Sequence, residues 1–241
     1  MILSKQSLHE KLIYNMDFLK EKKKGWLFYK TKNGAEFQFR FIDNHEIMEI
    51  FIKPTNEVKD WKVNFYASSI DIGVGRVHKG YYNEVKEFLL FLKNNQFNIE
   101  NICEFRIFGY SYGGGCTKVF VPCLRTILAF EYKIHPFIIG FSNEGCKSIN
   151  ERTSNFISFE TKTNLITICN SNDIVTKIPY NFVSGGIVIN IGKKRKWWKT
   201  DIKIFPFFYN KKKSGIYKFF TVTSHEYDDF FNNLDEYIKN M

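Results

Sequence analysis

The stretch Phe108-Gly109-Tyr110-Ser111-Tyr112-Gly113-Gly114-Gly115 decides the fold. It contains the pattern Gly-x-Ser-x-Gly, in which a strand turns abruptly into a helix and leaves a serine hydroxyl at the carboxyl edge of a sheet. Gly109 and Gly113 flank Ser111 because the strand and the helix must approach each other closely at this turn. A glycine-rich phosphate loop or a plain tight turn is the alternative. No lysine stands at the phosphate-loop position, and Gly-x-Gly-x-x-Gly is absent.

The pattern of apolar residues on both sides of this stretch predicts the other elements. Helices are expected over 5–23, 81–95, 111–132 and 227–238, and strands over 26–31, 36–42, 47–52, 61–68, 105–110, 135–141, 164–169 and 186–191. Turn signals between the first strands indicate an N-terminal antiparallel region. The later alternation of strands and helices predicts an α/β fold, with a mostly parallel central sheet and helices on both faces. One domain over residues 1–241 is the economical interpretation.

Composition limits the partners and the cofactors. Of the 241 residues, 35 are Lys or Arg and 25 are Asp or Glu, so the net charge of +10 favours anionic partners. With 44% apolar residues, the chain is neither a disordered tail nor a coiled coil. The cysteines are odd in number and form no Cys-x-x-Cys pair, so we expect no metal, no cofactor and no disulfide framework. No signal peptide and no membrane-spanning run is seen, which predicts a cytoplasmic protein, at most peripheral at a membrane.

A nucleophilic serine needs a histidine base and a carboxylate that orients the base. In this fold the chain order is Ser, then the acid, then His. His135 lies only 24 residues after Ser111, which leaves no room for a strand-borne acid between them. His225 stands just before the last helix, and Asp173 follows the strand over 164–169. The candidate triad is therefore Ser111, Asp173 and His225.

Four blocks in this order resemble the signatures of the class 3 lipases, the fungal-lipase-like branch of the α/β-hydrolases. They are Val77-His78-Lys79-Gly80-Tyr81, Gly109-Tyr-Ser-Tyr-Gly-Gly, Asn170-x-x-Asp173-x-Val175-x-x-Ile178-Pro179 and Ser224-His225. The resemblance covers about residues 60–230. It implies an α/β-hydrolase fold and a carboxylic ester hydrolase with Ser111 as the nucleophile, Asp173 as the orienting acid and His225 as the base.

The resemblance also implies two oxyanion-hole donors, which are Ser68 and the backbone N–H of Tyr112. His78 corresponds to a residue beside the site that is not catalytic, and we interpret it as structural. The chain departs from the family pattern at Tyr66, Tyr110, Tyr112 and Thr176, and its Gly140–Gly145 block lacks the family's Pro and Arg. Only nine residues separate Ser68 from His78, which is too short for a lid helix. We therefore expect an open site or a lid from another segment.

A basic, aromatic segment lies between the candidate acid and the candidate base. Its membrane-contact candidates are Lys193, Lys194, Arg195, Lys196, Trp197 and Trp198. Such a mixture suits the interface of an anionic bilayer. It can also bind single-stranded nucleic acid, or form a solvated hairpin whose aromatic side chains pack inward. Nucleic acid is the least favoured of the three.

The sequence thus predicts a lipase-like serine ester hydrolase that cleaves acyl esters of lipids or small esters through an acyl-enzyme. The basic segment adds an anionic membrane as a candidate peripheral partner, beside the solvated hairpin. The departures from the family pattern motivate an alternative, a catalytically silent hydrolase fold that binds an anionic membrane or another protein.

Overall fold

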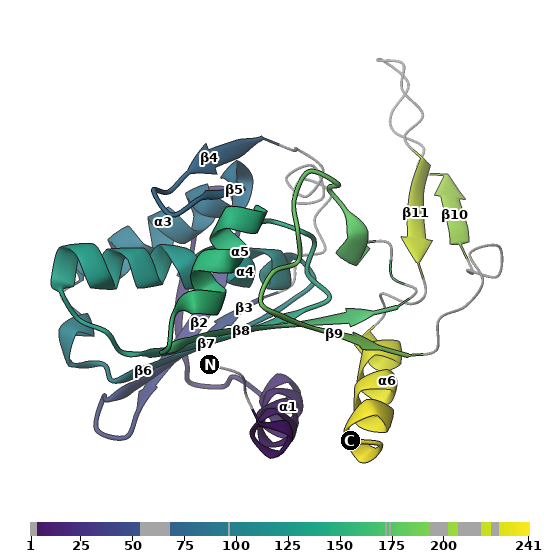
Figure 1. Cartoon of the computed structure of the whole chain (residues 1–241), viewed down its shortest axis with the longest axis horizontal. Coiled ribbons are helices and arrows are strands. Elements are labelled where there is room, and N and C mark those ends of the chain that lie inside the picture. The colour runs from purple at the N-terminus through teal and green to yellow at the C-terminus, as the bar shows by residue number, and fades with distance from the viewer. Residues whose placement is uncertain are drawn as a thin grey trace.

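The computed structural model describes residues 4–53, 68–95, 97–171, 173, 175–192, 202–206, 218–222 and 227–241. Within these residues, a seven-stranded sheet in the order β1-β2-β3-β6-β7-β8-β9 forms the centre of the molecule (Figure 1). Its strands are β1 (Leu27–Lys30), β2 (Glu36–Ile42), β3 (Ile47–Ile52), β6 (Glu104–Tyr110), β7 (Phe137–Asn143), β8 (Thr163–Asn170) and β9 (Ile187–Ile191).

One strand of this sheet, β2, runs opposite to the other six. The strands β1, β2 and β3 pair antiparallel, whereas β3, β6, β7, β8 and β9 pair parallel. This confirms the expected antiparallel N-terminal region and the mostly parallel remainder. The strands β6, β7 and β8 are buried along nearly their whole length, as parallel strands covered on both faces must be. The strand expected over 61–68 lies outside the described residues except for Ser68.

Helices cover both faces of the sheet (Figure 1). One face carries α3 (Lys79–Asn94), α4 (Tyr112–Ile127) and α5 (Glu151–Phe159), and the other carries α1 (Lys5–Lys20) and α6 (Tyr227–Lys239). Neighbouring residues of a strand point to opposite faces. Ile107 of β6 therefore belongs to the core beneath α3 and α4, while Phe108 belongs to the core beneath α1 and α6.

Local signals explain where the helices begin and end. The side chain of Ser4 accepts a hydrogen bond from the Ser7 N–H at the start of α1, and Asn150 caps α5 in the same way. The helix expected over 111–132 is shorter than expected. The helix α4 ends at Ile127, and one π-helical turn, Leu128–Tyr132, follows before Lys133 adopts a left-handed conformation with φ 60°.

Two small hairpins complete the described structure. The strands β4 (Ser69–Asp71) and β5 (Arg76–His78) pair antiparallel, so the stretch between Ser68 and His78 forms a hairpin and not a lid helix. The strands β10 (Ile202–Pro206) and β11 (Lys218–Val222) also pair antiparallel and lie beside the main body (Figure 1). Short 3₁₀ turns cover Ile99–Asn101 and Val175–Lys177.

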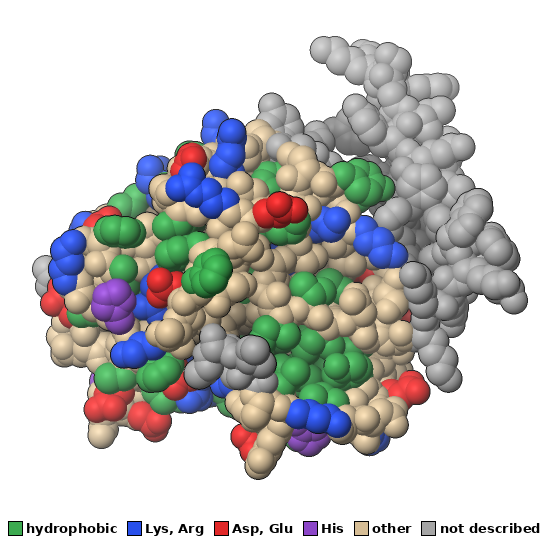
Figure 2. All heavy atoms as spheres, viewed as in Figure 1, with side chains coloured by type: hydrophobic (Ala, Val, Ile, Leu, Met, Phe, Trp, Pro, Cys, Tyr) green, Lys and Arg blue, Asp and Glu red, His purple; other side chains and the backbone are tan. Residues whose placement is uncertain are grey.

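The described surface carries charges of both signs. Figure 2 shows Lys and Arg side chains spread over several elements of the viewed face, with acidic side chains among them. None of the helices in the described part of the chain has the length and apolar character that a bilayer crossing requires.

Candidate active site

Ser111 stands at the turn between β6 and α4. Its backbone has φ 54° and ψ −115°, outside the regions that residues with a side chain ordinarily occupy. A conformation of this kind costs about 1–3 kcal/mol and persists only where the surroundings over-determine it. Ser111 keeps 8% of its residue surface exposed, so it is recessed in this conformation.

The glycines around Ser111 fill places where a side chain has no room. A Cβ on Gly109 would lie 2.1 Å from the carbonyl oxygen of Gly113, and a Cβ on Gly113 would lie 2.0 Å from that of Ile52. A Cβ on Gly114 would lie 2.6 Å from the carbonyl oxygen of Asn143. The start of α4 thus lies against the ends of β3, β6 and β7. This close approach requires the run of small residues that follows the serine.

Hydrogen bonds from two serines support the first turn of α4. The Ser142 hydroxyl, from β7, donates to the Gly114 carbonyl oxygen at 2.8 Å, and the Ser148 hydroxyl donates to the Gly115 carbonyl oxygen at 3.0 Å. Both serine side chains are fully buried. The helix that follows the candidate nucleophile is therefore fixed by side chains from outside the helix.

Lys118 is a buried lysine one helical turn beyond these glycines, and no pattern in the sequence indicates its role. Its ammonium group donates to the carbonyl oxygens of Gly145 (2.7 Å) and Cys146 (3.0 Å). Burial lowers the pKa of Lys118 below its usual value. The lysine thereby ties α4 to the loop that follows β7.

Asp173 lies at the carboxyl end of β8. The side chain is fully buried, and its Oδ1 accepts a hydrogen bond from the Val175 N–H at 2.8 Å. The Asp173 N–H donates to the Asn170 carbonyl oxygen, and the Thr176 hydroxyl donates to the Asp173 carbonyl oxygen. Since β7 alone separates β8 from β6, the strand that precedes Ser111, the two strand ends are roughly 10 Å apart.

The structure describes three further residues that the sequence analysis named near the site. Tyr112 opens α4, where backbone N–H groups point out of the helix end. Ser68 directly precedes β4, and its carbonyl oxygen accepts a hydrogen bond from the Lys79 N–H at 2.9 Å. His78 is buried against the rings of Tyr81 and Phe182.

His225 lies outside the described residues, between β11 and α6. The basic and aromatic side chains of residues 193–198 also lie outside them. The base and the membrane contact therefore stay predictions from the sequence.

A second buried carboxylate occupies the same sheet edge. Glu144 follows β7 directly, is fully buried and has φ 51°. Its N–H donates to the Ile168 carbonyl oxygen at 2.8 Å, and the Tyr110 hydroxyl donates to its Oε2 at 3.4 Å. Sequence reasoning missed this residue because it noted the Gly140–Gly145 block only for its missing Pro and Arg.

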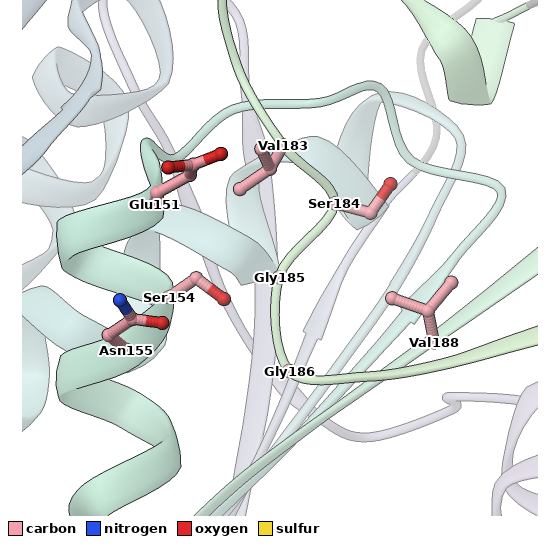
Figure 3. Close-up of a pocket in the computed structure, with 8 residues that line it drawn as sticks. All are labelled: Glu151, Ser154, Asn155, Val183, Ser184, Gly185, Gly186 and Val188. Atoms are coloured by element: carbon pink, nitrogen blue, oxygen red, sulfur yellow. The ribbon is translucent and has the colours of Figure 1, made fainter.

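One hollow of the described structure lies away from Ser111 and Asp173. It has a volume of about 380 Å³ and lies between α5, with Glu151 and Ser154, and the loop that contains Gly185 and Gly186 (Figure 3). Its lining includes neither Ser111 nor Asp173. Among the described residues, no three His, Cys, Asp or Glu side chains are grouped to hold a metal ion.

Comparison with solved structures identifies the fold. No family model matches the sequence, and no curated protein matches it significantly. The Rhizomucor miehei lipase propeptide complex is 15% identical over 78% of this chain and 70% of its own, with a TM-score of 0.57. A triacylglycerol lipase described as having a serine protease triad at its catalytic centre is 14% identical over 79% and 82%, with a TM-score of 0.60. The Penicillium expansum triacylglycerol lipase is 10% identical over 78% and 81%, with a TM-score of 0.52.

These neighbours are fungal class 3 lipases, and at such low identity the likeness shows the fold. The chain has the α/β-hydrolase fold of the fungal lipases. This confirms the fold that the resemblance implied.

Proposed function

We propose that this α/β-hydrolase chain is a serine carboxylic ester hydrolase that cleaves acyl esters of lipids. The observation that carries the proposal is the backbone of Ser111, a residue with a side chain held at φ 54° and ψ −115° between a buried strand and a buried helix. Strain of this kind clusters at functional sites. The fold is also that of several triacylglycerol lipases.

The proposed reaction is acyl transfer in two steps. His225 takes the proton of the Ser111 hydroxyl as its oxygen attacks the ester carbonyl, and Asp173 orients the imidazole. The tetrahedral intermediate expels the alcohol, which receives that proton from His225, and leaves an acyl-enzyme. Water activated by His225 then attacks the acyl-enzyme, which releases the fatty acid and restores Ser111.

The surroundings of Asp173 support its role in this proposal. The carboxylate is fully buried, and the Val175 N–H holds one of its oxygens. A carboxylate fixed at one oxygen keeps the other oriented, which is what an acid that aligns an imidazole requires. Its strand end shares the sheet edge with Ser111.

The oxyanion would be stabilised by backbone donors. Tyr112 N–H lies at the first position of α4, where the helix dipole adds partial positive charge. Ser68 is the second donor in the proposal. Loss of one such donor typically lowers kcat by about 10²–10³-fold.

Labelling with a fluorescent fluorophosphonate tests the proposal, because only an activated serine reacts at an appreciable rate. We expect the wild type to be labelled and Ser111→Ala to be inert. His225→Ala and Asp173→Asn should react slowly, with Asp173→Asn losing on the order of 10⁴-fold. Hydrolysis of short-chain and long-chain acylglycerols and of phospholipids would then define the ester.

Two matched controls sharpen this test. Ser171→Ala removes a serine that follows β8 at the same sheet edge and should leave labelling unchanged. Glu144→Gln removes the other buried carboxylate at that edge and should cost less than tenfold if Asp173 is the orienting acid. A folded wild type that stays unlabelled would refute the hydrolase and leave the silent fold as a binding module.

A further inference from the structure

The N-terminal helix α1 carries a polar side chain on its buried side. Leu12, Asn15, Phe18 and Leu19 are its buried residues, and Asn15 is the only polar residue among them. Its side chain is fully excluded from solvent. A buried amide is unfavourable unless its donors and acceptors are satisfied. The bonding partner of Asn15 therefore explains why the helix keeps an amide in an apolar interface.

That partner is Asn143, the last residue of β7. Asn15 Nδ2 donates to Asn143 Oδ1 at 2.8 Å, and Asn143 Nδ2 donates back to Asn15 Oδ1 at 3.2 Å. Asn143 is also fully buried. The two amides form a reciprocal pair that joins α1, on one face of the sheet, to the sheet's carboxyl edge.

Asn143 in turn holds the turn that contains Ser111. Its Nδ2 donates to the Gly109 carbonyl oxygen at 3.1 Å, and its own carbonyl oxygen accepts the Ser111 N–H at 2.8 Å. Asn143 thus bonds to the residue on each side of Tyr110, its partner in the β6–β7 register. These two bonds fix the peptide groups through which the chain enters the strained conformation.

The direction of the Asn143 amide depends on this geometry. The Gly109 carbonyl oxygen can only accept, so Nδ2 of Asn143 must face it. Oδ1 of Asn143 must then face α1, where a donor is needed. Asn15 supplies that donor and, through its own Oδ1, an acceptor for Nδ2.

We propose that Asn15 is a positioning residue that holds Ser111 in its strained backbone conformation through Asn143. The inference rests on the proposed function insofar as it concerns catalysis. The geometry that it describes can also be measured without any activity.

The kinetic test compares Asn15→Leu and Asn15→Asp with Leu12→Ala. Leu12 is equally buried on the same helix, one turn earlier, and its truncation loosens α1 while leaving the amide pair intact. We expect both Asn15 variants to lose about 10–100-fold in kcat, with KM nearly unchanged, because small displacements of a nucleophile are costly. Leu12→Ala should lower Tm at least as much and keep the wild-type kcat.

Amide exchange supplies the second readout, which does not depend on activity. In Asn15→Leu the Ser111 amide should exchange about tenfold faster, as expected when one buried hydrogen bond is weakened. The amide of Ile107, in the middle of β6, should be unchanged. If Asn15→Leu does not fold, Asn15→Ser takes its place.

Wild-type kcat and wild-type exchange at Ser111 in the Asn15 variants would overturn the inference. Equal losses in Leu12→Ala would overturn it as well, because they would mean that α1 acts only through stability. If the wild type proves inert towards the fluorophosphonate, the proposed function fails, and the exchange experiment still decides the role of Asn15.

Discussion

The conformation of Ser111 is maintained by what surrounds it. A residue with a Cβ at φ 54° is strained, so it persists only where the surrounding packing favours it. Gly109 and Gly113 allow β6, α4 and the end of β3 to pack closely on both sides of Ser111, where an added Cβ would lie within about 2.1 Å of a carbonyl oxygen. The packing of these neighbouring residues therefore stabilises the strained turn.

Gly113→Ala tests this at the level of one methyl group. Inside an exposed helix, Gly→Ala stabilises a protein by roughly 1 kcal/mol. Here the new Cβ would lie 2.0 Å from the carbonyl oxygen of Ile52. We expect steric overlap to dominate, with a loss of about 3 kcal/mol or more in the free energy of unfolding and no labelling of Ser111. Urea denaturation and fluorophosphonate labelling measure the two effects.

Gly73→Ala is the control for this substitution. Gly73 has φ +86°, and a Cβ there would meet no atom within 4 Å, so only backbone strain of about 1 kcal/mol is expected. Labelling should be retained. A Gly113→Ala variant that is as stable and as reactive as Gly73→Ala would show that the turn tolerates a side chain.

Some residues of the candidate site could be predicted from the sequence because their role is local. Gly109, Ser111 and Gly113 belong to one turn, so their spacing alone indicates the geometry. The role of Asn15 depends on Asn143, 128 positions away. A sequence without its fold does not show such a pair.

At the scale of elements, α1 is attached to the sheet by a buried charge network as well as by apolar packing. Tyr14 of α1 donates a hydrogen bond to Glu49 of β3, whose side chain is 1% exposed. Arg40 Nε donates to the same carboxylate at 2.7 Å, and Arg106 Nη1 donates to the Tyr14 hydroxyl at 3.0 Å. Burial and the neighbouring Glu49 raise the pKa of Tyr14 to about 12. The phenol therefore stays a donor at neutral pH.

Tyr14→Phe should show how much this bond contributes. It removes one donor from a buried carboxylate, which typically costs about 1.5–3 kcal/mol. Tyr29→Phe is the matched control, because Tyr29 donates to Glu87 at 3.0 Å and neither of these side chains is buried. We expect the control to cost less than about 1 kcal/mol. Equal losses of unfolding free energy in the two variants, measured by urea denaturation, would contradict a special role for burial.

The elements that could be predicted are those with long apolar periodicity. The strand over 105–110 and the helix over 81–95 match β6 and α3 within two residues. The helix α5 was missed because it has nine residues and only two of them, Thr153 and Ile157, are buried. The end of α4 was misplaced because apolar periodicity continues through the π turn of Leu128–Tyr132.

At the scale of the whole molecule, the sheet is buried between two helical layers, and titratable groups are buried with it. Burial raises the pKa of the Cys123 thiol from 9.0 to about 12, and it raises those of Cys146 and Cys169 as well. Burial lowers the pKa of Lys118. As the pH rises, the stabilisation of the fold by the protonated thiols is lost, whereas the destabilisation by the buried charged lysine is relieved. These groups therefore contribute with opposite signs to the change of stability at alkaline pH.

Cys123→Ala isolates one thiol of this balance. The folded state keeps the proton of Cys123 up to about pH 12, whereas the unfolded state releases it near pH 9.0. The stabilisation from the protonated thiol is therefore complete below pH 9 and is lost as the pH rises towards 12. One proton corresponds to about 1.4 kcal/mol per pH unit. The variant should flatten the decline of unfolding free energy above about pH 9 by up to this slope, measured by urea denaturation under reducing conditions.

Cys103→Ala, which removes an exposed thiol, is the control and should leave the slope unchanged. Identical slopes in the two variants would mean that water reaches Cys123 in the folded state.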